Sequence, residues 1–234
     1  AEWIEKSRHE LARSQARRFR ETAVDLGGLL IKLGQFFSTR VDLLPPSSIE
    51  ELSVLQDEGK SVTFTQLRDL AESEFAAPLD HVFESIAEQP LASASLGQVH
   101  LGRLSTGETV AVKIQRPGIE DLVATDLKAV GRIVQLIRRF TNWERFIDLE
   151  AIYKEFSETL WDELDYLKEG KNAETISANN QDDQDLIIPR IYWQYTTRRV
   201  LTMEYIEGIK VTDLDGMARQ GINRQVLASR LLQV

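Results

Sequence analysis

The sequence predicts an α+β protein in which helices precede and flank an antiparallel sheet of about five strands. Three observations support this class. Residues 2–23 and 119–140 contain no proline and repeat apolar residues at helical spacing. The segments 109–115, 187–193 and 198–208 are rich in β-branched or apolar residues, which is typical of strands. With 234 residues and 42% apolar content, the chain is long enough for one large domain or two small ones.

The composition argues against several kinds of function. A formal net charge of -9 disfavours general nucleic-acid binding, which needs a basic surface. The chain has no cysteine, which rules out disulfides and thiolate chemistry, and its three histidines lie far apart in sequence, which disfavours a zinc site. No apolar run approaches the length of a membrane span and no signal peptide opens the chain, so we expect the chain as given to be soluble. The localisation that we expect is cytoplasmic and peripheral to the membrane.

Charge is distributed unevenly along the chain. Residues 1–40 carry eight Lys or Arg against five Asp or Glu, whereas residues 150–190 carry eleven acidic against four basic residues. Four arginines cluster within the helix predicted at 2–23: Arg13, Arg17, Arg18 and Arg20. Contact with a membrane surface and a plain solvated helix face are both open for this segment, and the solvated face is the commoner case.

The segment from Leu26 to Phe37 is apolar at almost every position, which predicts a buried helix. Only Lys32 and Gln35 interrupt it, and at a spacing of three they share a helix face. A lysine on such a surface must pair with an anion or extend its head into water, and both alternatives are open. The prolines at 45–46 end this element.

Further helices are predicted before the sheet. Ser48 and Glu51 have the spacing of a capping box, which predicts a helix that starts there and runs to about residue 57. Two shorter helical stretches, 65–75 and 78–87, follow. They carry no recognisable arrangement of chemically active residues.

The strand at 109–115 places one charged residue in an apolar run. Because side chains alternate along a strand, Val110, Val112 and Ile114 share one face, and Lys113 lies on the other with Ala111 and Gln115. A Val-Ala-x-Lys strand is the kinase pattern in which the lysine neutralises nucleotide phosphates and is held by a glutamate on a helix. The alternative is an edge-strand lysine in water.

The loop predicted at 90–101 stands where a kinase carries its glycine-rich phosphate loop. Alanine and serine replace most of the glycines here, so we expect a stiffer loop that holds a triphosphate differently. An ordinary hairpin loop is the alternative. Residues 105–108 then predict a hairpin turn into the lysine strand.

A helix predicted after Asp148 carries a misplaced carboxylate. Glu163 falls on its apolar side, with Leu149, Ile152, Phe156, Leu160 and Leu167. A carboxylate there needs a partner, so we predict that Glu163 and Lys32 approach one another. Asp162, Asp165 and Glu169 fall on the opposite side, where a solvated acidic face and a functional site are both open. Asn172 and residues 178–185 predict a polar loop.

The end of the second of the two later strands, 198–208, suggests a hinge. Its last residues are Met-Glu-Tyr-Ile-Glu-Gly, and backbone groups of Glu204, Tyr205 and Ile206 would meet an adenine if the kinase pattern holds. Helical stretches at about 212–220 and 223–234 follow.

An ordered set of short motifs runs through these elements: Lys32-x-Gly34-Gln35, Asp42-Leu43-Leu44-Pro45, Leu55-Gln56-Asp57, Ala92-x-Ala94-x-x-Gly97-Gln98-Val99, Val110-Ala111-Val112-Lys113 and Glu163-Leu164-Asp165-Tyr166-x-x-Glu169-x-x-Asn172. The set resembles the UbiB (AarF/ABC1-type) family of atypical protein-kinase-like proteins. The resemblance implies a kinase-like N-lobe, made of an antiparallel sheet plus a regulatory helix, with a helical N-terminal extension. It also implies binding of ATP or ADP, ATPase activity, and a role in isoprenoid quinone biosynthesis at a membrane, with lipids, quinone precursors and quinone-biosynthesis proteins as partners.

The resemblance also implies roles for individual residues. Lys113 would bind phosphate and Glu169 would be its helix partner. Lys32 and Gln35 would come from an extension helix covering the active site, with Glu163 and Asp165 nearby. Nucleotide binding would involve Ala92, Ser93, Ala94, Ser95, Gly97, Val99, Ala111, Lys113, Glu204, Tyr205 and Ile206. The helical pattern by itself does not favour Glu169, unless a helix end near Gly170 re-aims that side chain or the acidic side faces the cleft. Gly59 and Lys60 stand where relatives usually have a proline pair.

The predicted organisation is a helical extension (1–89), a kinase-like N-lobe with an inserted helix (90–208), and a hinge with the start of a truncated C-lobe (209–234). No His-x-Asp-x-x-x-x-Asn loop and no Asp-Phe-Gly motif follow the hinge. We therefore expect a piece of a longer protein that is inactive alone, with the Mg²⁺ ligands in the missing part. A non-catalytic interaction module is the alternative.

Overall fold

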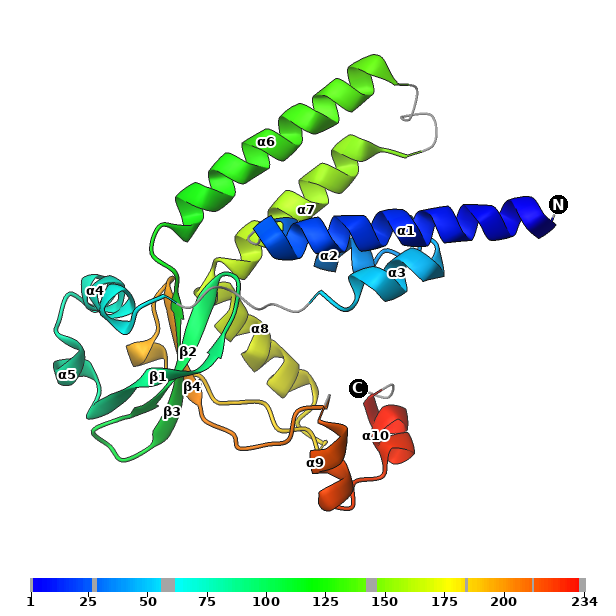
Figure 1. Ribbon diagram of the computed structural model, residues 1–234. Coiled ribbons are helices and arrows are strands. Elements are labelled where there is room, and N and C mark those ends of the chain that lie inside the picture. The colour runs from blue at the N-terminus through cyan, green and yellow to red at the C-terminus, as the bar shows by residue number, and fades with distance from the viewer. Residues whose placement is uncertain are drawn as a thin grey trace. The chain divides into compact units, whose positions relative to one another are not determined.

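The computed structural model describes residues 2–26, 29–55, 62–141, 147–183, 185–211 and 213–231, with side chains described from residue 10 onwards apart from residue 26. The chain divides into two compact units, Ala1–Glu204 and Tyr205–Val234. The first unit holds the sheet and the helices that surround it (Figure 1).

The sheet is antiparallel and its strands follow chain order: β1 (Ser85–Ser93), β2 (Gly97–Arg103), β3 (Thr109–Gln115) and β4 (Val200–Glu204). The α+β class is confirmed, but the count of five strands is wrong within the described residues. Residues 187–193 form one isolated bridge, between Ile191 and Met203, and then enter the short 3-10 helix η2 (Trp193–Tyr195). Pro189 has no N–H to donate, which limits strand pairing there.

The sheet also begins earlier than the sequence predicts. The helical stretch at 78–87 shrinks to α5 (Leu79–Val82), and β1 starts three residues later. Most of the predicted loop at 90–101 is therefore strand, and only residues 94–96 connect β1 to β2. Pro90 lies at an irregularity in the β1–β2 register, which is where a strand tolerates proline.

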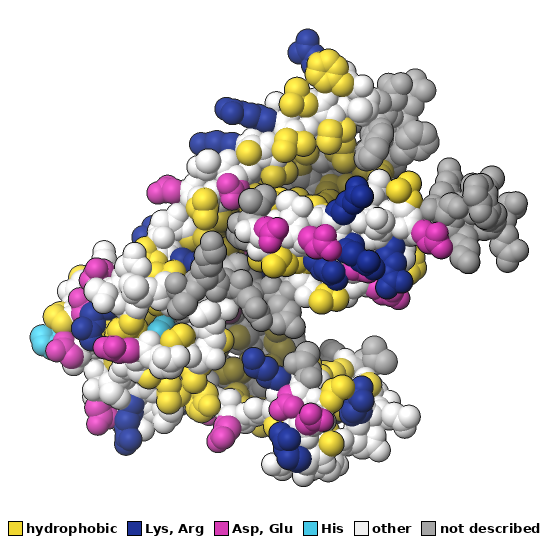
Figure 2. All heavy atoms as spheres, viewed as in Figure 1, with side chains coloured by type: hydrophobic (Ala, Val, Ile, Leu, Met, Phe, Trp, Pro, Cys, Tyr) yellow, Lys and Arg dark blue, Asp and Glu magenta, His cyan; other side chains and the backbone are white. Residues whose placement is uncertain are grey.

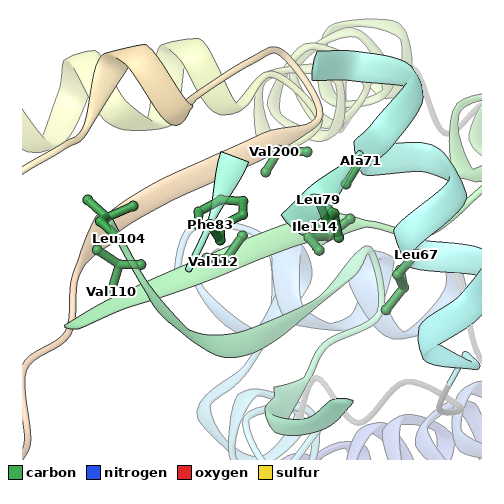
Figure 3. Packing of buried hydrophobic residues seen from close by; sticks show 9 residues of the cluster. All are labelled: Leu67, Ala71, Leu79, Phe83, Leu104, Val110, Val112, Ile114 and Val200. Carbon is green, nitrogen blue, oxygen red and sulfur yellow. The ribbon is translucent and has the colours of Figure 1, made fainter. Parts of the chain in front are cut away.

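One face of the sheet packs against two helices of the N-terminal region. Val110, Val112 and Ile114 of β3 are fully buried there against α4 (Phe64–Phe75) and α5, as the alternation in the sequence predicts (Figure 3). The nine residues of this core are Leu67, Ala71, Leu79, Phe83, Leu104, Val110, Val112, Ile114 and Val200. Lys113 consequently points to the opposite face.

The extension consists of α1 (Glu2–Leu26), α2 (Leu29–Ser38) and α3 (Pro46–Leu52), which pack on one another (Figure 1). The capping box predicted at Ser48 is wrong: α3 starts at Pro46, and Ser48 is buried inside the helix. Proline suits the first helical position because its missing N–H is not needed there. The helix ends at Leu52 and residues 53–55 are not helical, so its predicted continuation is wrong over these residues, while residues 56 and 57 lie outside the described residues.

Three further helices complete the first unit. α6 (Ile119–Phe140) and α7 (Leu149–Glu163) lie side by side as a hairpin that extends away from the sheet (Figure 1). A buried cluster joins them to α2 and to the β1–β2 connection through Leu29, Leu96, Leu127 and Leu160. α8 (Tyr166–Asn179) follows α7 after a break, so the polar loop predicted to include Asn172 is wrong at that residue.

The second unit contains α9 (Leu214–Arg219) and α10 (Arg224–Leu231), near the two helical stretches predicted from the sequence. Within the described part of the chain, no helix combines the length and apolar character needed to cross a bilayer.

Candidate functional site

Lys113 is paired with a glutamate from α8. Its Nζ lies 2.8 Å from both carboxylate oxygens of Glu169, and the same ammonium lies 4.7 Å from the centre of the Tyr166 ring. The first contact is a pair of charge-assisted hydrogen bonds, and the second is a cation–π contact. Glu169, and not Glu163, is the helix partner of Lys113.

A break between α7 and α8 aims Glu169 at the strand. Asp165 caps α8 by accepting hydrogen bonds from the backbone N–H groups of Leu167 and Lys168. Gln115, two residues after the lysine, donates from Nε2 to the carbonyl of Leu164 just before the cap. The predicted helix is therefore not continuous: α7 and α8 are separated at residues 164–165. This break, and not a helix end near Gly170, redirects the Glu169 side chain.

The predicted approach of Lys32 to Glu163 is confirmed. Lys32 Nζ on α2 lies 2.7 Å from Glu163 Oε2 at the end of α7, and the side chains are 11% and 41% exposed respectively. The neighbouring buried cluster, which includes Leu29, Leu96 and Leu160, holds α2 in this position. The pair therefore links the extension to α7, the helix before the one that carries Glu169.

These two ion pairs lie in one cleft of about 530 Å³. It is lined by Lys32, Ala94, Leu96, Gly97, Lys113, Thr159, Asp162, Glu163, Tyr166, Glu169 and Asn172. From the sequence, Leu96, Thr159, Tyr166 and Asn172 have no predicted site role, and a functional site was only one of two alternatives for Asp162. A signal for Tyr166 exists: once Asp165 is recognised as an N-cap, Tyr166 and Glu169 fall three residues apart on one face of the new helix.

Gly97 allows the close approach of β2 to α8. A Cβ at this position would lie 2.6 Å from the Tyr166 hydroxyl oxygen and 2.7 Å from the backbone oxygen of Ile114. Gly97 itself is an ordinary strand residue and pairs with Gln115 of β3. Glycine is needed here for space and not for an unusual loop conformation.

Several predicted site residues are not among the described residues that line the cleft. Gln35 donates from Nε2 to the carbonyl of Leu55 at 3.3 Å, and so ties α2 to the segment after α3. Asp165 acts as the α8 cap. The others belong to strands, to the buried β1–β2 connection or to the region after β4: Ala92, Ser93, Ser95, Val99, Ala111, Glu204, Tyr205 and Ile206.

The motif Lys32-x-Gly34-Gln35 therefore divides its contacts between two places. Lys32 reaches the cleft, whereas Gly34 packs so closely that a Cβ would lie 2.2 Å from Leu55 Cδ1 and 3.1 Å from Phe19 Cε1. Gly34 and Gln35 dock α2 on its neighbours, which aims Lys32.

The cleft brings cationic and anionic side chains together. Two ammonium groups, from Lys32 and Lys113, reach it, and an ammonium with three donors can hold a carboxylate and a phosphate oxygen together. Among the described residues, no group of three His, Cys, Asp or Glu side chains is placed to hold a metal ion.

An antiparallel sheet whose central strand carries a lysine paired with a helix glutamate, beside a helical extension, defines a kinase-like N-lobe. The chain belongs to the ABC1 atypical kinase-like domain family, which it matches over residues 54–234. The resemblance drawn from the motifs is confirmed.

Similar curated proteins come from bacteria and plants. The chain is 41% identical over 226 residues to an uncharacterized protein of Synechocystis, covering 97% of this chain and 39% of that protein. It is 38% identical to the "Probable protein kinase UbiB" of Azotobacter vinelandii, covering 99% of this chain and 43% of that protein. It is 37% identical to "ACTIVITY OF BC1 COMPLEX KINASE 7, chloroplastic" of Arabidopsis thaliana, covering 99% of this chain and 33% of that protein.

A solved structure shares the fold. It is titled as the complex of Rv3197 with erythromycin from Mycobacterium tuberculosis, and it superposes with a TM-score of 0.60 at 25% identity. The match covers 96% of this chain and 54% of that one. The chain thus spans about two fifths of the length of the curated relatives and about half of the solved relative.

Proposed function

We propose that this chain supplies the phosphate-binding part of a nucleotide site in an atypical kinase-like ATPase that supports isoprenoid quinone biosynthesis at a membrane surface. The observation that carries the proposal is the contact of Lys113 with Glu169 at 2.8 Å inside the cleft. This pair holds an ammonium where it can neutralise the phosphates of ATP or ADP.

The second ion pair supports a site to which large substrates have limited access. Lys32 belongs to the extension, and its contact with Glu163 keeps α2 against the cleft that contains Lys113. With α2 acting as a lid on the cleft, nucleotide hydrolysis or a small substrate is favoured over a protein substrate, because a folded protein needs an open approach to the reacting phosphate. The role in quinone biosynthesis rests on the family resemblance.

The experiment is nucleotide binding by the full-length protein with Lys113→Met. One charge-assisted contact contributes about 1.5 to 3 kcal/mol, so calorimetric titration should show ATP and ADP affinities reduced by about tenfold or more. Lys154→Met, which changes an exposed lysine on α7, is the matched control and should leave affinity unchanged.

Equal affinities for Lys113→Met and the control would return Lys113 to the role of a surface lysine. Absence of any saturable nucleotide binding by the unchanged full-length protein would favour the non-catalytic interaction module.

A further inference from the structure

The distal half of α6 is basic, whereas the protein as a whole is acidic. Residues 128–140 contain four Lys or Arg and no acidic residue, whereas the whole chain carries a formal net charge of -9. Arg138 bonds Glu150 across the hairpin. Within the described residues, no ion pair is recorded for Lys128, Arg132 or Arg139, and all three are exposed.

An exposed apolar stripe runs beside these charges. Ile133 and Leu136 are each 55% exposed and Phe140 is 75% exposed. Their spacing places them on one side of the helix, adjacent to the side that holds Lys128, Arg132 and Arg139. We call these six residues the distal face of α6. Figure 2 shows basic side chains along the outer edge of this helix, with apolar side chains next to them.

The distal face is separate from the packing that holds the hairpin together. The buried residues of α6 are Ile119, Val123 and Leu127, which belong to its first half and to the cluster shared with α7. Tyr153 of α7 also bonds the backbone carbonyl of Leu127. Substitutions on the distal face should therefore leave the hairpin folded.

Charge decides which partner fits. Two copies of the distal face in contact would place like charges against each other, which disfavours self-association. A helix with basic residues beside an exposed apolar stripe suits a surface that is negatively charged outside and apolar just beneath, which is the structure of an anionic lipid leaflet.

We infer that the distal face of α6 docks the protein on anionic phospholipid membranes. Ile133, Leu136 and Phe140 enter the boundary between headgroups and acyl chains, and Lys128, Arg132 and Arg139 contact lipid phosphates. The inference deepens the proposed membrane role, because it assigns that role to a surface outside the nucleotide cleft.

The test is flotation of the full-length protein with vesicles of phosphatidylcholine alone or mixed with phosphatidylglycerol. We expect binding to the mixed vesicles that weakens as salt is raised. Lys128→Gln/Arg132→Gln/Arg139→Gln should reduce the partition coefficient about a hundredfold, because each basic residue near an anionic leaflet contributes about fivefold. Ile133→Ser/Leu136→Ser/Phe140→Ser should reduce it tenfold or more at every salt concentration.

Matched controls change exposed residues of the same kinds elsewhere: Lys154→Gln/Lys171→Gln and Leu91→Ser/Ile187→Ser. They should bind vesicles like the unchanged protein. Equal binding to both vesicle types, or unchanged binding by either α6 variant, would overturn the inference. So would a concentration-dependent dimer that the apolar variant abolishes, because it would assign the stripe to a second copy.

Nucleotide titration of the same variants separates this inference from the proposed function. The α6 variants should keep full nucleotide affinity, since none of the changed residues lines the cleft. Loss of vesicle binding by the α6 variants with intact nucleotide binding supports the docking surface. Intact vesicle binding by the α6 variants, together with defective nucleotide binding by Lys113→Met, would leave only the nucleotide proposal standing.

Discussion

Each of the two lysines in the cleft already has its own glutamate. Lys113 contacts both oxygens of Glu169 and the Tyr166 ring, and Lys32 contacts Glu163. An incoming phosphate would therefore share each ammonium with a carboxylate, which the three donors of a lysine allow. The pairs position the cations before a nucleotide arrives, which reduces the reorganisation that binding requires.

Replacing Lys32 tests the link between the extension and the cleft. Lys32→Ala leaves Glu163 without this partner and should lower the free energy of unfolding by about 1 to 2 kcal/mol, less than for a fully buried pair because Glu163 is 41% exposed. It should also change the ratio of ATP to ADP affinity in the full-length protein. Lys154→Ala is the control, and identical urea midpoints and affinity ratios for the two variants would contradict the role of Lys32 as a tie.

Glu51 is the other residue-scale feature, and it holds α1 to α3. Its carboxylate accepts hydrogen bonds from Arg13 and Arg17 at 3.0 and 3.1 Å and forms an ion pair with Arg20 at 2.8 Å, and the side chain is nearly buried. Hydrogen bonds from Arg17 and then Arg13 lower the pKa of Glu51 below its ordinary value of 4.5, against the opposing effect of burial.

This lowered pKa predicts a pH dependence of stability. The stabilisation is fully present above pH 4.5 and is lost as pH falls through the lower folded-state pKa, because the unfolded chain takes up the proton first. Glu51→Gln should therefore be less stable than the unchanged protein at neutral pH, and the difference should shrink in acid. Urea midpoints measured at neutral pH and in steps below pH 4.5 check this, with exposed Glu50→Gln as control. A difference that stays constant with pH would exclude the ionised carboxylate as its source.

At the scale of elements, the contact between β2 and α8 sets the position of the lysine partner. Gly97 lies under Tyr166, and Gln115 bonds the carbonyl of Leu164 just before α8 begins. Together these contacts fix the start of the helix that carries Glu169. The strand and the helix are far apart in sequence, so their spacing depends on close packing.

Gly97→Ala tests this packing. The added Cβ would meet the Tyr166 hydroxyl and the Ile114 carbonyl at under 3 Å, and overpacking of this kind costs about 1 to 3 kcal/mol. Thermal unfolding should show the loss of stability, and nucleotide affinity should fall as Glu169 shifts. Gly208→Ala is a matched control, because nothing lies within 4 Å of the Cβ it would add. Equal unfolding temperatures for the two variants would show that α8 tolerates a wider spacing.

At the scale of the whole molecule, the 234-residue chain should bind nucleotide without hydrolysing it. Positioning and metal charge supply most of the catalysis of phosphoryl transfer, and the sequence contains neither the catalytic-loop motif nor the Asp-Phe-Gly motif that provides them. Phosphate release measured on protein that shows a nucleotide-dependent thermal shift checks this. Metal-dependent turnover that disappears in Lys113→Met would contradict it.

The sequence by itself determined the features that depend on local spacing. The α+β class, the long helix at 119–140 and the alternation that isolates Lys113 from Val112 follow from periods of 3.6 and 2 residues, which backbone geometry imposes within a segment. Lys32 and Glu163 were identifiable as partners because each is a charge on an otherwise apolar surface, which requires compensation wherever the helices pack.

Only the tertiary structure decided which distant groups meet. It paired Glu169 with Lys113 because α8 starts afresh at Asp165, and it directed Gln35 to Leu55 instead of to the cleft. It also made Glu51 the partner of three arginines instead of a cap, and reduced the fifth strand to one bridge. The physical reason is the same in each case: a helix break or a polar contact depends on packing between segments far apart in sequence, and no period within one segment records that packing.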